Sequence, residues 1–391
     1  MITNCLTLCD SNIPWHHNRY SKHHLMARLA RHNDVVFVNP QVDALAYGRT
    51  KGWGRVASVR GRLEQPEGEA LNVFTPLALP WKARSERFIA ADQRYLCRQF
   101  KSIVRRYPGR ELVLFIGNPY NVFLLDAFPE CKCSIYHCSD NFPALFQGAT
   151  RQTVQRREAE LIKRADVVLC SHESLLRKCQ DLGGNARYLG HAVDERLLRP
   201  LDRPVPDCPA ELAAIPSPRV GFVGSLDGGI DYGLLREVGK RCSKVSFVFI
   251  GQTGEGQQAN VQGLTEAPNM HWLGPKPWSE LPGLLWNLDV AIIPYAVDGF
   301  TTARSPLKLF EYLAAGLPVV STTAPPEEDF APYVTVVRGA EEFAGALQAA
   351  VHGKTDGLAQ VALMRARYTW DRRAEEMAQI IEDGLERTSR A

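Results

Sequence analysis

Residues 305–322 read SPLKLFEYLAAGLPVVST, and this stretch contains the start of a helix, its end and a following strand. Ser305 can cap the helix through its side-chain oxygen, and Pro306 suits the first helical position, where a backbone N–H is not needed. Gly316 and Pro318 are typical of a helix end, and the β-branched run after them predicts a short buried strand. The stretch therefore predicts a helix followed by a strand, as in an α/β protein.

Two charged residues in this helix indicate a nucleotide ligand. The bare N–H groups and the dipole of a helix start attract phosphate, and Lys308 in the first turn adds a positive donor. Glu311 lies one turn later and suits a pair of sugar hydroxyls. The alternative is a capped surface helix with one ordinary ion pair between Lys308 and Glu311.

The composition predicts a soluble globular protein. The chain has 391 residues, which allow two domains of ordinary size, with 45% hydrophobic and 23% charged residues. No apolar run approaches a membrane span, and the first residues, MITNCLTLCD, predict a strand and lack the charged start of a signal peptide. We therefore expect a cytoplasmic protein.

Ten cysteines are scattered along the chain without a C-x-x-C pair. Cys131, Cys133 and Cys138 are close in sequence, but they lie on and around a predicted strand. Reduced thiols in a cytosolic protein explain them more simply than zinc does, so we predict no metal site and no cofactor.

The charge is uneven: residues 1–200 carry a net +10 and residues 201–391 a net −7. A basic first half predicts an anionic surface or substrate as its neighbour, and we predict no nucleic-acid partner. Residues 81–110 interleave nine basic residues with apolar and aromatic ones. Such a helix can lie on an anionic membrane, which makes the protein a candidate for peripheral association with the inner face of the plasma membrane. The alternative is a surface helix whose apolar side packs on its own sheet.

The order of strands and helices predicts two doubly wound domains. Residues 1–200 read as a first Rossmann-like series. Six prolines fall within residues 199–218, and we predict a linker at residues 201–218. Residues 219–369 repeat the pattern, and residues 370–391 predict an amphipathic helix. The first strand is not followed by G-x-G-x-x-G, which argues against a dinucleotide-dependent dehydrogenase.

Ligands of doubly wound sheets bind beyond the carboxyl ends of strands, which directs attention to the first half's loops. Asp140 follows the strand in CSIYHCSDNF and suits a general base, although a turn cap is its commonest role. The loop after the first strand carries Trp15, His16 and Arg19, which could contact an acceptor; a solvated loop with a packed Trp15 is the alternative.

The second half has its own candidates at strand ends. Gly224 and Ser225 open a loop, GSLDGG, whose glycines allow a backbone to approach phosphate closely. Lys276 follows a later strand, and Tyr295 follows another and could line a donor pocket.

The run from Pro306 to Val320 resembles the C-terminal nucleotide-sugar site of GT-B glycosyltransferases, especially family four, whose segment reads roughly P-x-K-x-x-E-[YA]-x-A-x-G-x-P-V-V. Lys308, Glu311, Gly316 and Pro318 match, but Ala303 stands where many of these enzymes have a second glutamate.

The stretch also resembles the inverting glucuronosyltransferase of xanthan assembly, which has Ser and Lys at the places of Ser305 and Lys308. There a Ser-Asp matching Ser139-Asp140 supplies the catalytic base. His191 resembles a position near the interdomain cleft, and a structural histidine is the alternative. In GT-B proteins the last helix usually crosses back onto the first domain.

The resemblance implies two Rossmann-like domains that face each other across a cleft: an N-terminal acceptor domain and a C-terminal nucleotide-sugar domain. It implies a metal-independent glycosyltransferase with a nucleotide-sugar donor, UDP-sugar favoured, and a saccharide or lipid-linked acceptor in bacterial polysaccharide assembly. Asp140 as base implies inversion. The alternatives are a nucleotide-sugar epimerase of the same fold and a non-catalytic nucleotide-sugar-binding partner.

Overall fold

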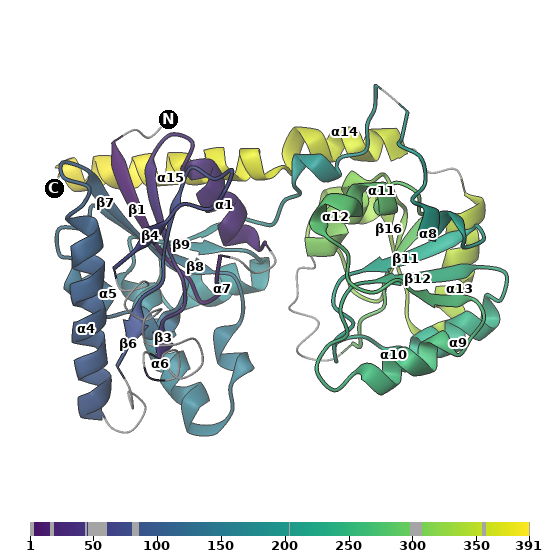
Figure 1. Cartoon of the computed structure of the whole chain (residues 1–391), viewed down its shortest axis with the longest axis horizontal. Helices are drawn as coiled ribbons and strands as arrows, with labels where there is room; N and C mark the ends of the chain where they lie inside the picture. The colour runs from purple at the N-terminus through teal and green to yellow at the C-terminus, as the bar shows by residue number, and fades with distance from the viewer. Residues whose placement is uncertain are drawn as a thin grey trace. The chain divides into compact units, whose positions relative to one another are not determined.

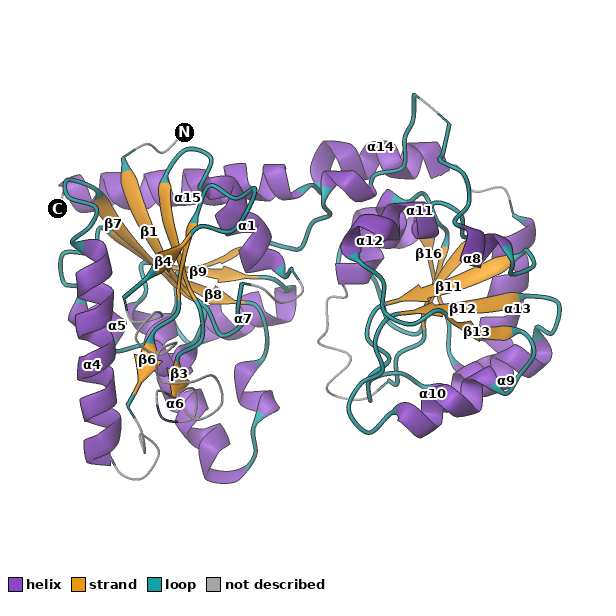
Figure 2. Ribbon diagram, in the orientation of Figure 1, coloured by secondary structure: helices purple, strands orange, loops and turns teal. Residues whose placement is uncertain are grey.

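The chain forms two compact units in a computed structural model (Figures 1 and 2) that describes residues 4–15, 19–43, 45, 61–79, 86–202, 204–297, 307–353 and 357–390. Unit 1 comprises Met1–Gly190 and Asp371–Ala391, and unit 2 comprises His191–Trp370. The boundary thus differs from the one expected at residue 200. The proline-rich stretch 201–218 is grouped with unit 2, where Leu212 and Ile215 lie in the hydrophobic core.

Unit 1 is built on an eight-stranded sheet in the order β10-β9-β8-β7-β1-β2-β5-β4. All neighbouring strands are parallel except the β4–β5 pair. The strands are β1 (Cys5–Asp10), β2 (Asp34–Val38), β4 (Leu63–Glu64), β5 (Asn72–Phe74), β7 (Glu111–Ile116), β8 (Cys133–Cys138), β9 (Val167–Cys170) and β10 (Ala186–Tyr188). A separate parallel pair is formed by β3 (Val42–Asp43) and β6 (Leu77–Ala78).

The helices of unit 1 include the end of the chain. They are α1 (Ser21–Leu29), α4 (Glu86–Val104), α5 (Leu124–Ala127), α6 (Gly148–Arg164), α7 (Glu173–Asp181) and α15 (Trp370–Arg390), with short 3₁₀ turns at Pro119–Asn121 and Phe142–Leu145. α15 is tied to this unit by ion pairs of Asp371 with Arg28 and Arg31 and by an Arg187–Asp383 pair of 3.6 Å.

Unit 2 contains a six-stranded parallel sheet in the order β13-β12-β11-β14-β15-β16. Its strands are β11 (Arg219–Val223), β12 (Ser246–Ile250), β13 (Met270–Trp272), β14 (Val290–Ile293), β15 (Val319–Ser321) and β16 (Val334–Val336). Its helices are α8 (Ala210–Ala213), α9 (Tyr232–Arg241), α10 (Gln258–Thr265), α11 (Leu281–Leu285), α12 (Leu307–Ala314), α13 (Gly339–His352) and α14 (Gly357–Arg367). The 3₁₀ turns are Glu195–Leu197, Trp278–Glu280 and Glu328–Tyr333.

Both sheets reverse their strand order beside their first strand. In unit 1 the chain runs outward from β1 to β2 and β5, and then returns to place β7 on the other side of β1. In unit 2 the same reversal lies between β11 and β14. The gap beyond the carboxyl ends of the two strands at such a reversal is where doubly wound sheets bind ligands.

The basic helix α4 uses its apolar side for the core of unit 1. Leu96, Phe100 and Ile103 are buried there, and Gln99 hydrogen-bonds the backbone of Leu77. Only Phe88 among its described aromatic residues is strongly exposed. This packing matches the alternative that the apolar side covers the protein's own sheet, while part of the predicted segment, residues 81–85, lies outside the described residues.

Within the described parts of the chain, none of the helices combines the length and the apolar character that crossing a bilayer requires.

Candidate functional site

Helix α12 is held firmly against the end of β11. Tyr312, which is fully buried, accepts a hydrogen bond from the Val223 N–H at 2.8 Å and donates to the Val223 carbonyl at 3.3 Å. Leu309, Phe310 and Leu313 are also buried, so most of the helix surface is covered rather than one stripe alone. The predicted cap Ser305 lies outside the described residues. The predicted end is observed, since Gly316 has the positive φ of +75° that favours glycine.

This anchoring places Lys308 at the strand reversal of unit 2. Its ammonium nitrogen lies 4.0 Å from the ring centroid of Phe222 on β11 and 4.9 Å from that of Tyr295, which follows β14. Both aromatic rings are buried. Contacts between a cation and the faces of two rings hold the charge in place without neutralising it. The structure therefore brings Lys308 and Tyr295 together, and their role in a donor pocket stays a prediction.

The predicted glycine loop also lies next to the Lys308 ammonium group. Gly224 directly follows β11, and a Cβ atom at this position would stand 2.8 Å from the Lys308 ammonium nitrogen. Its φ of +143° is a conformation that side chains rarely adopt, and its N–H donates to the Ile250 carbonyl at 2.8 Å. Ser225 comes next and is partly buried. A bare backbone beside an ammonium group is an arrangement that suits phosphate oxygens.

Replacing Gly224 by alanine is expected to weaken nucleotide binding and to destabilise unit 2 by about 1–3 kcal/mol, because the Cβ would meet both an unfavourable φ and Lys308. Urea unfolding and calorimetric titration with UDP measure the two effects. Gly228→Ala in the same loop is the matched control, since the nearest atom to its added Cβ is Gln257 Nε2 at 3.6 Å. Equal effects of the two substitutions would contradict this account.

Glu311 is partly buried one turn after Lys308, and burial raises the pKa of its carboxyl to about 7. The Lys308 charge opposes that shift, whereas the Asp194 charge adds to it. Near neutral pH such a carboxyl can accept or donate hydrogen bonds. A group that can both donate and accept hydrogen bonds suits the hydroxyl groups of a sugar.

Two other predicted residues have structural partners. Lys276, expected after the end of β13, forms an ion pair with Glu211 of α8. His191 is partly buried, and its ring packs edge-on against Phe310 at 6.2 Å and Trp370 at 6.5 Å. Both observations fit structural roles, which was the alternative weighed for His191.

In unit 1, Asp140 lies two residues after β8, at the carboxyl edge of the sheet. It is exposed to solvent, and Ser139 donates a hydrogen bond from Oγ to its Oδ2 at 3.1 Å. Its negative charge adds to the burial that raises the pKa of Tyr20. Its charge also acts on Lys22, so Asp140 shares one electrostatic environment with two side chains at the start of α1. An exposed carboxylate at this edge can reach a substrate hydroxyl.

A buried charge cluster lies at the strand reversal of unit 1, and the sequence reasoning did not find it. Asp10 ends β1, is 4% exposed and accepts a hydrogen bond from Asn121 Nδ2 at 2.9 Å. Burial raises its pKa to about 7. Lys22 from α1 is 1% exposed and donates to Asn12 Oδ1, and burial lowers the pKa of its ammonium group. The available signal was the charged residue at a strand end, the same signal that drew attention to Asp140.

Asp10→Asn is expected to change the pH dependence of stability. The folded carboxyl keeps its proton up to about pH 7, while the unfolded one loses it near pH 4, so wild-type stability falls as pH rises between these values. Asparagine does not titrate, and the variant should therefore gain about 2–3 kcal/mol relative to wild type between pH 5 and pH 8.

Urea titrations at several pH values measure this difference. Asp126→Asn is the control, because Asp126 is an exposed carboxylate paired with Arg164. A pH-independent difference between Asp10→Asn and wild type would show that Asp10 ionises normally in the folded protein.

The loop after β1 is partly described. Trp15 is 6% exposed, and its ring packs edge-on against Phe37 with the ring centroids 4.9 Å apart. The backbone N–H of Trp15 donates to Asn39 Oδ1 at 2.8 Å. Arg19 stacks over the Trp15 ring at 5.5 Å and pairs with Glu69. The structure thus places Trp15 in the core, as the packing alternative expected. His16 lies outside the described residues.

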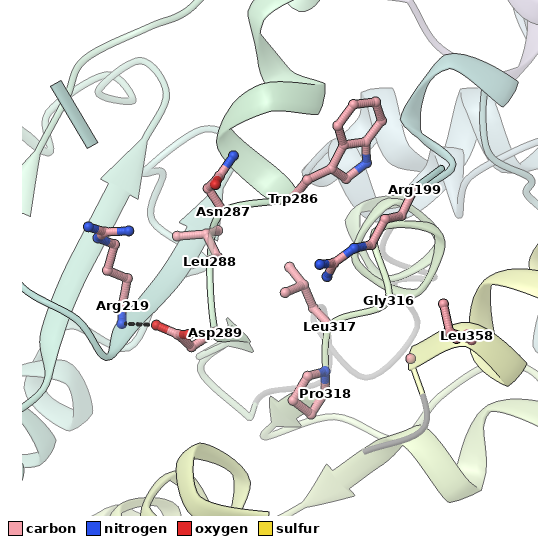
Figure 3. Close-up of a pocket in the computed structure, with 11 residues that line it drawn as sticks. Arg199, Arg219, Trp286, Asn287, Leu288, Asp289, Gly316, Leu317, Pro318 and Leu358 are labelled. Carbon is pink, nitrogen blue, oxygen red and sulfur yellow. Dashed lines mark hydrogen bonds between the residues drawn. The ribbon is translucent and has the colours of Figure 1, made fainter. Parts of the chain in front are cut away.

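A pocket of about 560 Å³ lies at the opposite edge of the unit 2 sheet (Figure 3). Its lining includes Arg219 at the start of β11, Asp289 before β14 and Pro318 before β15, and the Arg219 N–H donates to Asp289 Oδ2 at 2.6 Å. These are the amino ends of the strands. Because ligands of such sheets bind at the carboxyl ends, this pocket is not a candidate for the donor.

Residues 217–352, most of unit 2, match the family model described as glycosyl transferases group 1. The chain is also 30% identical over 201 residues to TuaH of Bacillus subtilis (strain 168), a protein assigned to teichuronic acid biosynthesis as a glycosyltransferase. That alignment covers 49% of this chain and 50% of TuaH, so the chain spans about half the length of this curated relative.

Solved structures match nearly the whole chain. HepE of Anabaena in complex with UDP superposes with a TM-score of 0.68 at 14% identity, covering 97% of this chain and all of HepE. Sucrose-phosphate synthase of Thermosynechococcus elongatus gives 0.68 at 15% identity, covering 98% and 99%. The predicted GT-B fold and the resemblance to GT-B glycosyltransferases are thereby confirmed. The closer likeness to the xanthan enzyme stays a prediction.

Proposed function

We propose that this GT-B protein is a glycosyltransferase that moves a sugar from a UDP-sugar to a saccharide or lipid-linked saccharide acceptor. The observation that carries the proposal is the place of Lys308, whose ammonium group lies at the strand reversal of unit 2 between two buried rings and beside Gly224. That edge is where a doubly wound domain binds a nucleotide. HepE in complex with UDP and with UDP-glucose, and the relative TuaH, support the donor class and a role in polysaccharide assembly.

The chain's own residues have distinct roles in this proposal. Lys308 and the backbone at the start of α12 bind the diphosphate, and Gly224 and Ser225 allow it to approach. Glu311 binds sugar hydroxyls, Tyr295 lines the donor pocket, and Lys276 remains a candidate for the base-binding loop. When the sugar–oxygen bond to the diphosphate breaks, the leaving group gains negative charge, which the Lys308 ammonium stabilises.

Asp140 is the proposed general base. The acceptor hydroxyl oxygen forms the new bond to the anomeric carbon, and its proton passes to the Asp140 carboxylate. A direct attack of this kind inverts the anomeric configuration. Asp140 suits the task because it is exposed at the carboxyl edge of unit 1. Arg19 and His16 remain candidates for acceptor contacts.

The place of action is also a proposal. We expect a cytoplasmic protein that can associate with an anionic membrane surface, because the outer side of α4 and the turn after it expose Arg94, Arg98, Arg105 and Arg106. Electrostatic contact alone would support this association, since the apolar side of α4 is committed to the core.

A thermal-shift screen with UDP-, GDP- and ADP-sugars tests the donor. We expect UDP-sugars to raise Tm and the other two classes to do so less. Incubation of the preferred UDP-sugar with and without saccharide acceptors then separates the alternatives: a transferase releases UDP in an acceptor-dependent way, whereas an epimerase converts the donor without releasing UDP. A chain whose Tm responds to no nucleotide sugar would rule out the proposal.

A further inference from the structure

Three buried cysteines meet in unit 1 although they are separated in the sequence. Cys138 ends β8, Cys170 ends β9, and Cys179 lies in α7. Cys138 and Cys170 are direct neighbours in the register of the two parallel strands, so their side chains leave the sheet on the same face. The three sulfur atoms all lie within 4.8 Å of one another, and each residue is fully buried. Figure 1 shows β8, β9 and α7 side by side.

The grouping differs from the one visible in the sequence. Cys131 and Cys133, the sequence neighbours of Cys138, do not belong to the cluster. Cys131 instead donates from its sulfur to the Cys133 carbonyl at 3.1 Å. Side chains alternate between the two faces of a strand, so a residue five positions before Cys138 points to the opposite face.

A buried carboxylate lies beside one member of the cluster, Cys138. Glu158 of α6 is 1% exposed, and its Oε1 lies 3.9 Å from Cys138 Sγ. It also accepts hydrogen bonds from Tyr136 OH at 3.0 Å and from the Lys178 ammonium at 2.6 Å. These two donors fix the orientation of the carboxylate, as outer-shell partners do in metal sites.

We propose that Cys138, Cys170 and Cys179 bind a thiophilic d¹⁰ cation, Zn²⁺, through their three sulfur atoms. Sulfur ligands about 2.3 Å from zinc in a tetrahedral site stand about 3.8 Å apart, so a contraction of at most about 1 Å would close the observed cluster around the ion. Binding displaces the thiol protons to solvent, and affinity should therefore rise with pH.

The site would stiffen the start of the Asp140 loop. Cys138 Sγ lies 3.8 Å from the Asp140 carbonyl, Ser171 N–H donates to the Cys138 carbonyl at 3.3 Å, and Ser171 Oγ donates to the Ser139 carbonyl at 2.9 Å. A metal ion linking β8, β9 and α7 would thus hold the point from which Asp140 projects. The metal assignment itself does not depend on the proposed transfer reaction.

Metal content of the full chain tests the proposal. The protein is expressed with added Zn²⁺, purified under a phosphine reductant and analysed by atomic emission. We expect about one Zn²⁺ per chain in wild type and in Cys131→Ala, and a loss of roughly ten-fold or more in Cys170→Ala and Cys179→Ala. Far-UV circular dichroism confirms that the variants fold. Equal zinc content in wild type and both cluster variants would overturn the assignment.

A second measurement keeps the test decisive if the variants do not fold. Refolded wild-type chain is titrated with Cd²⁺, and the ultraviolet sulfur-to-cadmium charge-transfer band reports thiolate ligation. We expect the band to saturate at about one equivalent and to strengthen as pH rises. Absence of the band, or wild-type zinc content below about a tenth of an ion per chain, would overturn the proposal.

Discussion

Lys308→Ala is expected to lower turnover of the donor by about 10²–10³-fold while leaving the fold intact. In the proposed reaction the Lys308 ammonium is the positive group that meets the charge developing on the leaving diphosphate. The Lys308 ammonium nitrogen is the nearest described atom to a Cβ placed at Gly224, whereas Lys276 is paired with Glu211. The alanine variant should also bind UDP more weakly, by roughly ten-fold, since the same contact exists before the reaction.

Steady-state kinetics and UDP titration measure the two losses. Lys244→Ala is the matched control, because Lys244 is an exposed lysine of the same unit that lies just before the amino end of β12, whereas the site is at the carboxyl ends of the strands. Lys308→Arg adds a sharper test. The guanidinium keeps the charge, but it is broader than an ammonium and would have to fit between the Phe222 ring and Gly224. We expect Lys308→Arg to recover little activity; full turnover in Lys308→Ala would contradict the assigned role.

Asp140→Asn is expected to lower kcat by about 10²–10⁴-fold, the usual contribution of a general base. The amide keeps the size of the side chain but cannot take a proton from the acceptor hydroxyl. UDP affinity should stay within about two-fold of wild type, because the proposal assigns nucleotide binding to unit 2 and Asp140 belongs to unit 1. The pattern of lost turnover with retained donor binding is what distinguishes a base from a residue that supports the fold.

Asp181→Asn, which changes another exposed aspartate of unit 1, is the control for this measurement. The configuration of the product gives an independent readout, since nuclear magnetic resonance of the transferred sugar reports inversion or retention directly. A retained configuration together with undiminished kcat in Asp140→Asn would remove Asp140 from the mechanism and favour the retaining chemistry of family four.

Much of the fold was predictable because its elements are coded locally. Buried parallel strands are short apolar runs, and the strands predicted at the first residues and after Gly316 and Pro318 appear as Cys5–Asp10 and Val319–Ser321. The helix predicted from Ser305 ends at Gly316 as expected. The position of a residue just after a strand also placed Asp140 at the carboxyl edge of its sheet. Each of these inferences uses only neighbouring residues and the geometry of one element.

By itself, the sequence determined two doubly wound series, the helix that carries Lys308, and the strand-end position of Asp140. Only the tertiary structure decided which distant residues meet: Lys308 with Gly224 and Phe222, Asp10 with Asn121, and the cysteine cluster. The physical reason is that hydrophobic periodicity specifies which face of an element is buried, but the neighbours on that face depend on strand order and register. Those long-range choices are made when the whole chain packs.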